Sequence, residues 1–220
     1  MSEDSHDGKP AITPAPNGPL LVRNLERLRN SKGDVLETSA RIALCRCGGS
    51  ANKPFCDGTH ARIGFKDAHS ADASADRTQP YEGQGVTILD NRFLCAHIGA
   101  CTVGLAAVFR YGQEPWIDPD AGPPEQVCEV IRRCPSGALA YALGGAGARG
   151  TVERDYEREP AITVSKDGPY FVVGGIALAC ETWGREASRE HYALCRCGKS
   201  KRKPFCDGAH WEAGFKDEKN

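Results

Sequence analysis

The chain has 220 residues, of which 40% are hydrophobic, and it carries a formal charge of −1 with a mean hydropathy of −0.45. No stretch approaches the roughly 18 apolar residues of a membrane span, and no net basic field favours nucleic acid or an anionic membrane as a partner. The polar, Pro-rich start lacks the apolar core of a signal peptide, so we expect a cytoplasmic protein.

Local patterns predict short elements throughout the chain. Apolar, β-prone runs and one helical spacing give, in chain order, strands over 20–22, 43–44 and 86–89, helices over 104–109 and 125–133, and strands over 138–143, 170–173 and 193–194. Asp57 and Asp207 stand where a helix N-cap would. The elements are too short for one large core and indicate several small units.

Cysteine is the compositional outlier. The chain has 11 cysteines, and without a secretory signal this number favours metal ligands over disulfides. An odd number also leaves at least one thiol outside any complete pairing.

An internal repeat organises the chain. Arg41–Asp67 and His191–Asp217 align without a gap at an offset of 150, with 18 of 27 positions identical. The match extends upstream, so we expect repeats over 11–67 and 161–217, after a disordered tail over 1–10. Linkers over 68–80 and 144–160 would flank an inserted unit over 81–143. The stretch 81–160 holds 7 basic and 11 acidic residues and is the acidic part of the chain.

Each repeat presents the same four candidate metal ligands. They are Cys45, Cys47, Cys56 and His60 in the first repeat, and Cys195, Cys197, Cys206 and His210 in the second. Three thiolates and an imidazole suit a soft or borderline metal. A structural zinc ion would use the same donors, although zinc sites more often contain Cys-x2-Cys. A disulfide framework would give the repeated histidine no role.

The run from Cys45 to His60, with Ser50, Pro54 and the Cys-Asp-Gly-Thr-His end, resembles the CDGSH (NEET) iron–sulfur motif, and Cys195–His210 matches it too. The resemblance implies a [2Fe–2S] cluster in each repeat, held by the three cysteines and the histidine. Better-known members pair two modules as a homodimer through a β-rich cap. The resemblance therefore implies an intramolecular pseudo-dimer here, and it favours a monomer.

The mixed ligand set has two chemical consequences. A neutral imidazole in place of a thiolate raises the reduction potential relative to all-Cys clusters. Imidazole must be unprotonated to bind metal, so we expect acid to weaken the iron–nitrogen bond and labilise the cluster.

The insert carries a third candidate site at Cys95, Cys101 and Cys134. Cys95-x5-Cys101 followed by Cys134-Pro135 resembles a divergent monocluster ferredoxin-like domain, with Ile98 where another cysteine would stand. Three cysteines suit a [3Fe–4S] cluster, and a [4Fe–4S] cluster would need a fourth ligand. His97 and Cys128 are the candidates, although His97 also suits a role beside the ligands and Cys128 a place in the core.

We therefore expect an α+β, small multi-domain protein: two β-rich CDGSH modules and an inserted ferredoxin-like α+β domain. Electron transfer is the leading function, with redox partner proteins. Cluster storage or delivery to apo iron–sulfur acceptors is the alternative, and a redox or pH sensor is a third. No nucleophile–base pair, phosphate loop or dinucleotide fingerprint points to an enzyme. Only the second ligand loop is basic, with Lys199, Lys201, Arg202 and Lys203, which indicates a solvated loop or a docking surface.

Overall fold

The computed structural model describes residues 8–144, 150–218 and 220, and its chain divides into two compact units. The first unit takes the chain up to Ala71, then Glu157–Trp183 and the residues from Arg189 onward; the second takes Asp72–Tyr156 and Gly184–Ser188. Both are built mainly of short strands with few helices. Most of the expected tail over 1–10, and 145–149 of the expected second linker, lie outside the described residues.

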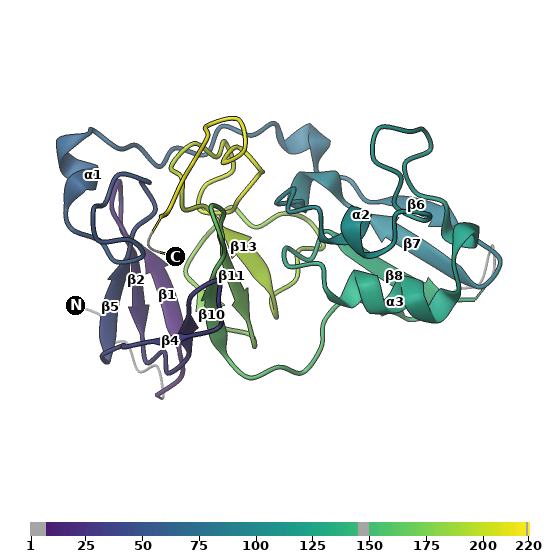
Figure 1. Cartoon of the computed structure of the whole chain (residues 1–220), viewed down its shortest axis with the longest axis horizontal. Coiled ribbons are helices and arrows are strands. Elements are labelled where there is room, and N and C mark those ends of the chain that lie inside the picture. The colour runs from purple at the N-terminus through teal and green to yellow at the C-terminus, as the bar shows by residue number, and fades with distance from the viewer. Residues whose placement is uncertain (1–7, 145–149, 219) are drawn as a thin grey trace. The chain divides into compact units, whose positions relative to one another are not determined.

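The first unit contains two β-sheets, visible in Figure 1. One has the order β12-β1-β2-β5, and the other has the order β13-β11-β10-β3-β4. The first-repeat strands are β1 Ala11–Pro14, β2 Leu20–Arg23, β3 Leu28–Arg29, β4 Val35–Leu36 and β5 Arg41–Leu44. The second-repeat strands are β10 Ala161–Val164, β11 Tyr170–Val173, β12 Ala177–Leu178 and β13 Tyr192–Leu194.

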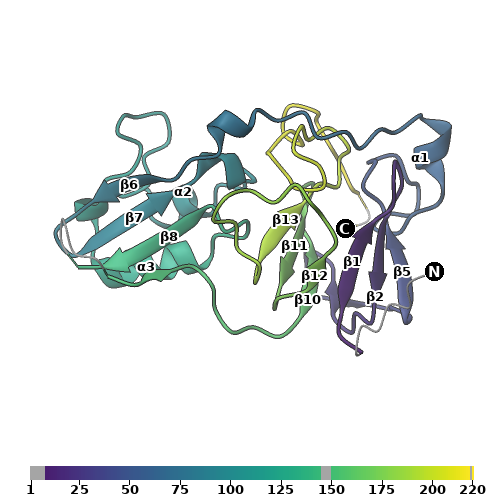
Figure 2. The same cartoon turned by 180° about the vertical axis from the view of Figure 1, so that it is seen from behind.

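The two repeats exchange strands. β12 of the second repeat pairs in parallel with β1 of the first, with Ile12 opposite Leu178 (Figure 2). In the equivalent place, β3 pairs in parallel with β10, with Ile162 opposite Leu28. Neither sheet is therefore complete without a strand from the other repeat.

One hydrophobic core serves both repeats. Its buried side chains come from both: Ile12, Leu20, Val22, Leu25, Leu28, Leu44, Ile162, Val164, Tyr170, Val172, Ile176, Leu178, Tyr192, Leu194 and Phe205. Strands of two to four residues are too short to be stable alone, so this common burial holds the exchanged strands in place.

The second unit is a four-stranded antiparallel sheet in the order β6-β7-β8-β9, with α3 packed on β8. Its strands are β6 Gln79–Glu82, β7 Val86–Asp90, β8 Leu139–Leu143 and β9 Val152–Glu153, and its α-helices are α2 Ala100–Gly104 and α3 Pro124–Arg132. Short 3-10 turns stand at η1 Ala73–Ala75, η2 Arg92–Leu94 and η3 Pro119–Ala121. Val127, Val130 and Ile131 turn the apolar face of α3 into the core of this unit.

Most predicted elements form, but the helix expected over 104–109 is wrong. The helix α2 instead begins after Gly99, which adopts a left-handed φ of 80°, and it ends at Gly104. Beyond it the chain turns so that Val108 and Phe109 enter the core, and Phe109 forms an isolated β-bridge with Ile117. The tertiary burial of these two side chains overrides the helical spacing.

The predicted caps also differ from the structure. The N-cap of α1 (Thr59–Arg62) is Gly58, while Asp57 accepts a hydrogen bond from the Thr59 backbone N–H at 3.0 Å. The matching described segment of the second repeat forms turns and no helix, although Asp207 bonds the Ala209 N–H in the same way. A single turn has too few internal hydrogen bonds to persist in both copies.

Parts of the expected linkers are structured. β9 lies within 144–160, and the first residues of β6 lie within 68–80. The segment Gly184–Ser188 of the second repeat belongs to the second unit, where the Arg185 N–H bonds Asp76 and Ala187 packs against the core. None of the helices in the described part of the chain is long and apolar enough to span a membrane.

Asp90 gives the second unit a predicted pH dependence. Its side chain is 2% exposed at the end of β7, and burial raises its pKa to about 7, opposed by Arg92 and by a hydrogen bond from Trp116. The folded state thus favours the protonated carboxyl, so stability is greatest below the unfolded pKa of about 3.9 and falls as pH rises towards 7. In Asp90→Asn, the urea midpoint followed by circular dichroism should lose this fall.

The exposed Glu114→Gln is the control and should keep the wild-type pH profile. An unchanged pH dependence in Asp90→Asn would contradict the role given to this carboxyl.

Candidate metal centres

In each repeat, the first two cysteines follow directly after a strand, and a loop closed by backbone hydrogen bonds brings the third cysteine back beside that strand. β5 leads into Cys45, whose backbone N–H donates to the Pro54 carbonyl at 2.8 Å, while the Cys56 N–H donates to the Ala43 carbonyl at 2.8 Å. The second repeat closes the same way, with Cys195 to Pro204 at 2.8 Å and Cys206 to Ala193 at 2.9 Å. We call 45–56 the first ligand loop and 195–206 the second.

The four predicted ligands of each repeat form two close pairs. In the first repeat the Sγ atoms of Cys45 and Cys47 lie 3.7 Å apart, and Cys56 Sγ lies 3.4 Å from His60 Nδ1. The second repeat gives 3.8 Å for its Cys195–Cys197 pair and 3.5 Å for its Cys206–His210 pair. All eight residues are described, yet in neither set do three ligand atoms lie within 4.8 Å of one another.

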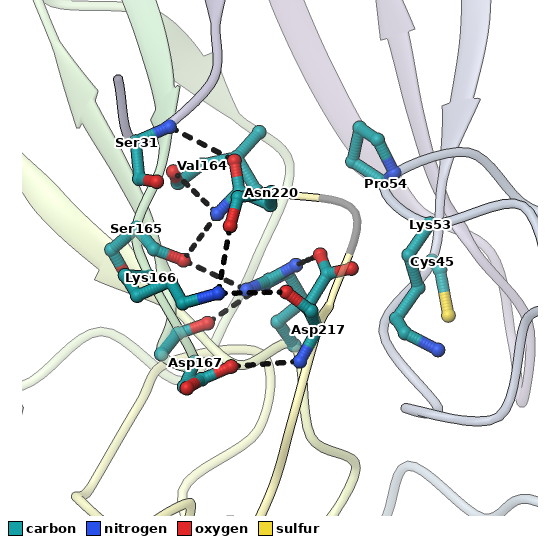
Figure 3. A network of polar contacts seen from close by, with 12 residues as sticks. Ser31, Cys45, Lys53, Pro54, Val164, Ser165, Lys166, Asp167, Asp217 and Asn220 are labelled. Atoms are coloured by element: carbon teal, nitrogen blue, oxygen red, sulfur yellow. Dashed lines mark hydrogen bonds and ion pairs between the residues drawn. The ribbon is translucent and has the colours of Figure 1, made fainter. Parts of the chain in front are cut away.

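A buried arginine between the first two cysteines anchors each loop. Arg196 donates to the carbonyls of Gly168 and Ser165 at 2.7 and 2.8 Å and pairs with Asp217, and the two charged side chains are 0% and 1% exposed. Figure 3 shows Asp217 within the polar network that also contains Asp167 and Asn220.

The first repeat has the same arrangement, but its ion pair is more exposed to solvent. Arg46 donates to the carbonyls of Gly18 and Ala15, and to Asp67 at 2.6 Å. The Asp67 side chain is 28% exposed. The arginine in each Cys-Arg-Cys run thus anchors its ligand loop. The sequence signal for this role was that both repeats carry arginine at this place.

Backbone N–H groups point at the thiol sulfurs. Gly58 donates to Cys56 Sγ and Gly208 to Cys206 Sγ, both at 3.5 Å, as expected from glycine at this place. The Lys199 N–H donates to Cys197 Sγ at 3.5 Å. Such bonds stabilise negative charge on sulfur and so favour metal-bound thiolate.

Burial opposes the ionisation of several of these thiols unless a cation is present, although the hydrogen bond from Cys195 lowers the pKa of Cys197. Burial raises the pKa of Cys47 to about 11, with smaller contributions from the neighbouring thiols at Cys45 and Cys56. Burial likewise raises the pKa of Cys206, assisted by negative charge at Cys195. Bound iron or zinc would remove this penalty by supplying positive charge, so the donor chemistry fits a metal centre.

The two ligand loops touch each other. A Cβ on Gly48 would lie 2.7 Å from the Cys197 carbonyl oxygen, and one on Gly198 would lie 2.6 Å from that of Cys47. Both glycines adopt a φ of +79°. Only glycine at these two positions allows the backbone beside Cys47 and the backbone beside Cys197 to approach so closely.

The two sites differ in exposure. Cys56 and His60 are partly exposed, whereas Cys206 and His210 are buried at 2% and 3%. Arg202, expected in a solvated or docking loop, is instead 4% exposed and donates to the Cys206 carbonyl at 3.0 Å. Its position beside the ligand places a positive charge at the second site that Asn52 does not supply at the first.

The second unit brings its three predicted cysteines to one cavity. Cys95 precedes α2, Cys101 lies in α2 and Cys134 follows α3, and all three line the cavity together with Arg92, Ser136 and Leu139. Burial raises the pKa of Cys95 to about 11; Arg92 opposes the rise, and the charges at Cys134 and Cys101 add to it. The set therefore also favours thiolates only when a cationic group is bound.

The two candidates for a fourth ligand are placed differently. His97 lines the same cavity and its backbone N–H donates to Cys95 Sγ at 3.3 Å. Cys128 is buried in the core on α3 and hydrogen-bonds with Tyr141, and it is absent from the cavity lining. Ser136, which sequence reasoning missed, puts its hydroxyl 3.8 Å from Cys134 Sγ.

Two family models match the chain. "Iron-binding zinc finger CDGSH type" matches residues 17–61 and 167–211, and "Divergent 4Fe-4S mono-cluster" matches residues 81–144. Two curated relatives are "Uncharacterized protein YjdI" of Escherichia coli K12 and its counterpart in Escherichia coli O157:H7. Each is 39% identical over 61 residues, which is 28% of this chain and 80% of the relative. No solved structure matches.

Fold, ligand pairs and family matches together define an iron–sulfur-binding protein. More particularly, the chain belongs to the CDGSH family. In the sequence, one CDGSH module precedes and another follows a divergent 4Fe–4S mono-cluster domain.

The two arginine anchors give a matched prediction. Asp217→Asn leaves the fully buried Arg196 charge uncompensated, so it should lower the free energy of unfolding by about 3–5 kcal/mol. Asp67→Asn should cost only about 1 kcal/mol, because water reaches that pair. Denaturant unfolding of the two variants measures both values. Equal losses would show that burial does not distinguish the anchors.

Proposed function

We propose that each repeat holds a [2Fe–2S] cluster and that the chain is an electron carrier. The ligands would be Cys45, Cys47, Cys56 and His60 in the first site, and Cys195, Cys197, Cys206 and His210 in the second. Each centre would accept and return one electron. The pairing of the ligand atoms is the observation that carries this proposal.

The spacings within the pairs fit tetrahedral metal atoms. Bonds of about 2.3 Å to sulfur and 2.0 Å to nitrogen put two thiolates about 3.8 Å apart, and a thiolate and an imidazole nitrogen about 3.5 Å apart. The observed values are 3.7 and 3.4 Å in the first site and 3.8 and 3.5 Å in the second. Each pair therefore suits one iron, with His Nδ1 as the ligand atom.

The separation between pairs favours two metals over one. A single tetrahedral zinc ion would gather all four ligand atoms within about 4 Å of one another. In both described sets, no three of these atoms lie within 4.8 Å. The arrangement supports a dinuclear centre over the zinc alternative.

For the middle site we propose a cubane-type cluster held by Cys95, Cys101 and Cys134. Three cysteines suit [3Fe–4S], and His97 is the better-placed fourth ligand for [4Fe–4S] because it shares the cavity while Cys128 does not. The match to a divergent 4Fe–4S mono-cluster family supports an iron–sulfur centre here.

We also propose that the repeats form an intramolecular pseudo-dimer, supported by the exchanged strands and the common core. The contacts between Gly48 and Cys197, and between Gly198 and Cys47, connect ligand residues of the two sites through backbone atoms. A short path of this kind favours electron exchange between the two centres and hence a carrier that docks with redox partner proteins.

One observation favours cluster delivery as a second candidate function. The Cys56–His60 pair of the first site is partly exposed, so an apo-acceptor could reach its iron. A neutral imidazole is also the most easily displaced of the four ligands. Delivery would use the first site, because the corresponding pair of the second site is buried.

Iron and acid-labile sulfide analysis of the anaerobically purified chain, with EPR, tests the cluster assignment. We expect about seven irons if the middle cluster is [3Fe–4S] and about eight if it is [4Fe–4S]. A colourless, zinc-loaded protein would overturn it.

A second experiment separates the two functions. The loaded protein is mixed with a reductant and an electron acceptor, or with an apo-ferredoxin. Redox cycling with the clusters retained supports electron transfer. Rapid transfer of clusters without electron flow would contradict the carrier and support delivery.

Arg92 predicts the direction of a potential shift at the middle cluster. It lines the cavity and stacks 4.4 Å from the centroid of the Trp116 ring, and its charge opposes the rise that burial causes in the pKa of both Cys95 and Cys101. Removing its charge in Arg92→Gln should make reduction harder and lower the midpoint potential by on the order of tens of millivolts. Potentiometric EPR titration measures this shift.

Arg110→Gln is the matched control, because Arg110 pairs with Asp118 and does not line the cavity. An unchanged or raised potential in Arg92→Gln would contradict the placement of a cluster beside this guanidinium.

A further inference from the structure

We propose that Tyr170, a residue of the second repeat, is a positioning residue for the first iron–sulfur site and helps that site to hold its cluster. The inference rests on the proposed function, because it concerns retention of a cluster at Cys45, Cys47, Cys56 and His60. It is carried by a contact that runs from the second repeat to the first and has no equivalent in the other direction.

The Tyr170 hydroxyl lies where the two ends of the first ligand loop meet. Its Oη is 2.7 Å from the Cys45 carbonyl oxygen and 3.0 Å from that of Pro54. The Pro54 carbonyl also accepts the Cys45 N–H at 2.8 Å. The hydroxyl proton is therefore shared between two carbonyl oxygens. One belongs to the first predicted ligand, Cys45, and the other to Pro54, two residues before the third predicted ligand, Cys56.

The same side chain contacts the second ligand loop. The guanidinium carbon of Arg196, between Cys195 and Cys197, lies 5.7 Å from the centroid of the Tyr170 ring. Tyr170 is 0% exposed, so water does not compete for its hydroxyl. It connects the anchor of the second site to the backbone of the first.

The contact is not reciprocal. At an offset of 150 the matching residue of the first repeat is Leu20, which is also 0% exposed but has no hydroxyl. The second ligand loop keeps its own Cys195-to-Pro204 bond at 2.8 Å, and Leu20 can offer it no donor. The repeats thus differ at this position: the second carries a buried hydroxyl where the first carries an aliphatic side chain.

The difference matters most where the cluster is least protected. Cys56 and His60 are partly exposed, so water and chelators reach this ligand pair of the first site. Restraint of Cys45 then falls to buried groups such as Tyr170.

Tyr170→Phe tests the proposal in the full, anaerobically loaded chain. Loss of visible absorption under an iron chelator reports the clusters, and His60→Cys and His210→Cys variants identify which phases belong to the two [2Fe–2S] centres, because an all-Cys centre has a different spectrum. We expect the first-site phase to accelerate about tenfold, the effect of one lost buried hydrogen bond, with the second-site phase unchanged. The EPR signal of the reduced first site should shift as well.

Tyr192→Phe is the matched control. Tyr192 is also buried, and its hydroxyl donates to the Ile176 carbonyl at 2.7 Å, outside both ligand loops. Acceleration of both phases alike in Tyr170→Phe, as from general destabilisation, or of neither phase, would overturn the proposal. A wild-type chain that binds no iron–sulfur clusters would instead overturn the proposed function.

Discussion

Parallel pairing of short strands across the two repeats, β1 with β12 and β10 with β3, is the constraint on which the first unit depends. Each exchanged strand has only two residues and is held by a core drawn from both repeats. This pairing brings the two ligand loops together, so that glycine is required at Gly48 and Gly198. The geometry of either candidate metal centre therefore depends on the other repeat, and a separate repeat would lack part of its sheet.

Duplication has kept the ligands and changed their surroundings. Both Cys-Arg-Cys runs keep a buried arginine, but the carboxylate partner is fully buried only in the second repeat. Arg202 adds a positive charge beside Cys206, while Tyr170 reaches the loop of the first site. The two candidate sites therefore differ in exposure: Cys56 and His60 are partly exposed, whereas Cys206 and His210 are buried.

The sequence predicted the repeat and the candidate ligands that the structure brings into close pairs, because metal binding requires particular side chains at fixed spacing. It also predicted β11 and α3 within a residue, since their apolar patterns are strong. The exchanged strands β3 and β12 were missed because two residues carry no periodicity. The role of Tyr170 was missed for another reason: its hydroxyl acts on a loop 116 to 125 residues away in the chain, and only the folded backbone shows that contact.

Pulsed EPR of the reduced protein tests the central claim, two dinuclear centres each bound by one histidine nitrogen, most directly. The account predicts strong nitrogen hyperfine coupling in the wild type. Part of the coupling on the [2Fe–2S] signals should be lost in His60→Cys and part in His210→Cys, and all of the coupling on these signals in the double variant. Absence of this coupling from the [2Fe–2S] signals of the wild type, or its persistence on these signals in the double variant, would contradict the account.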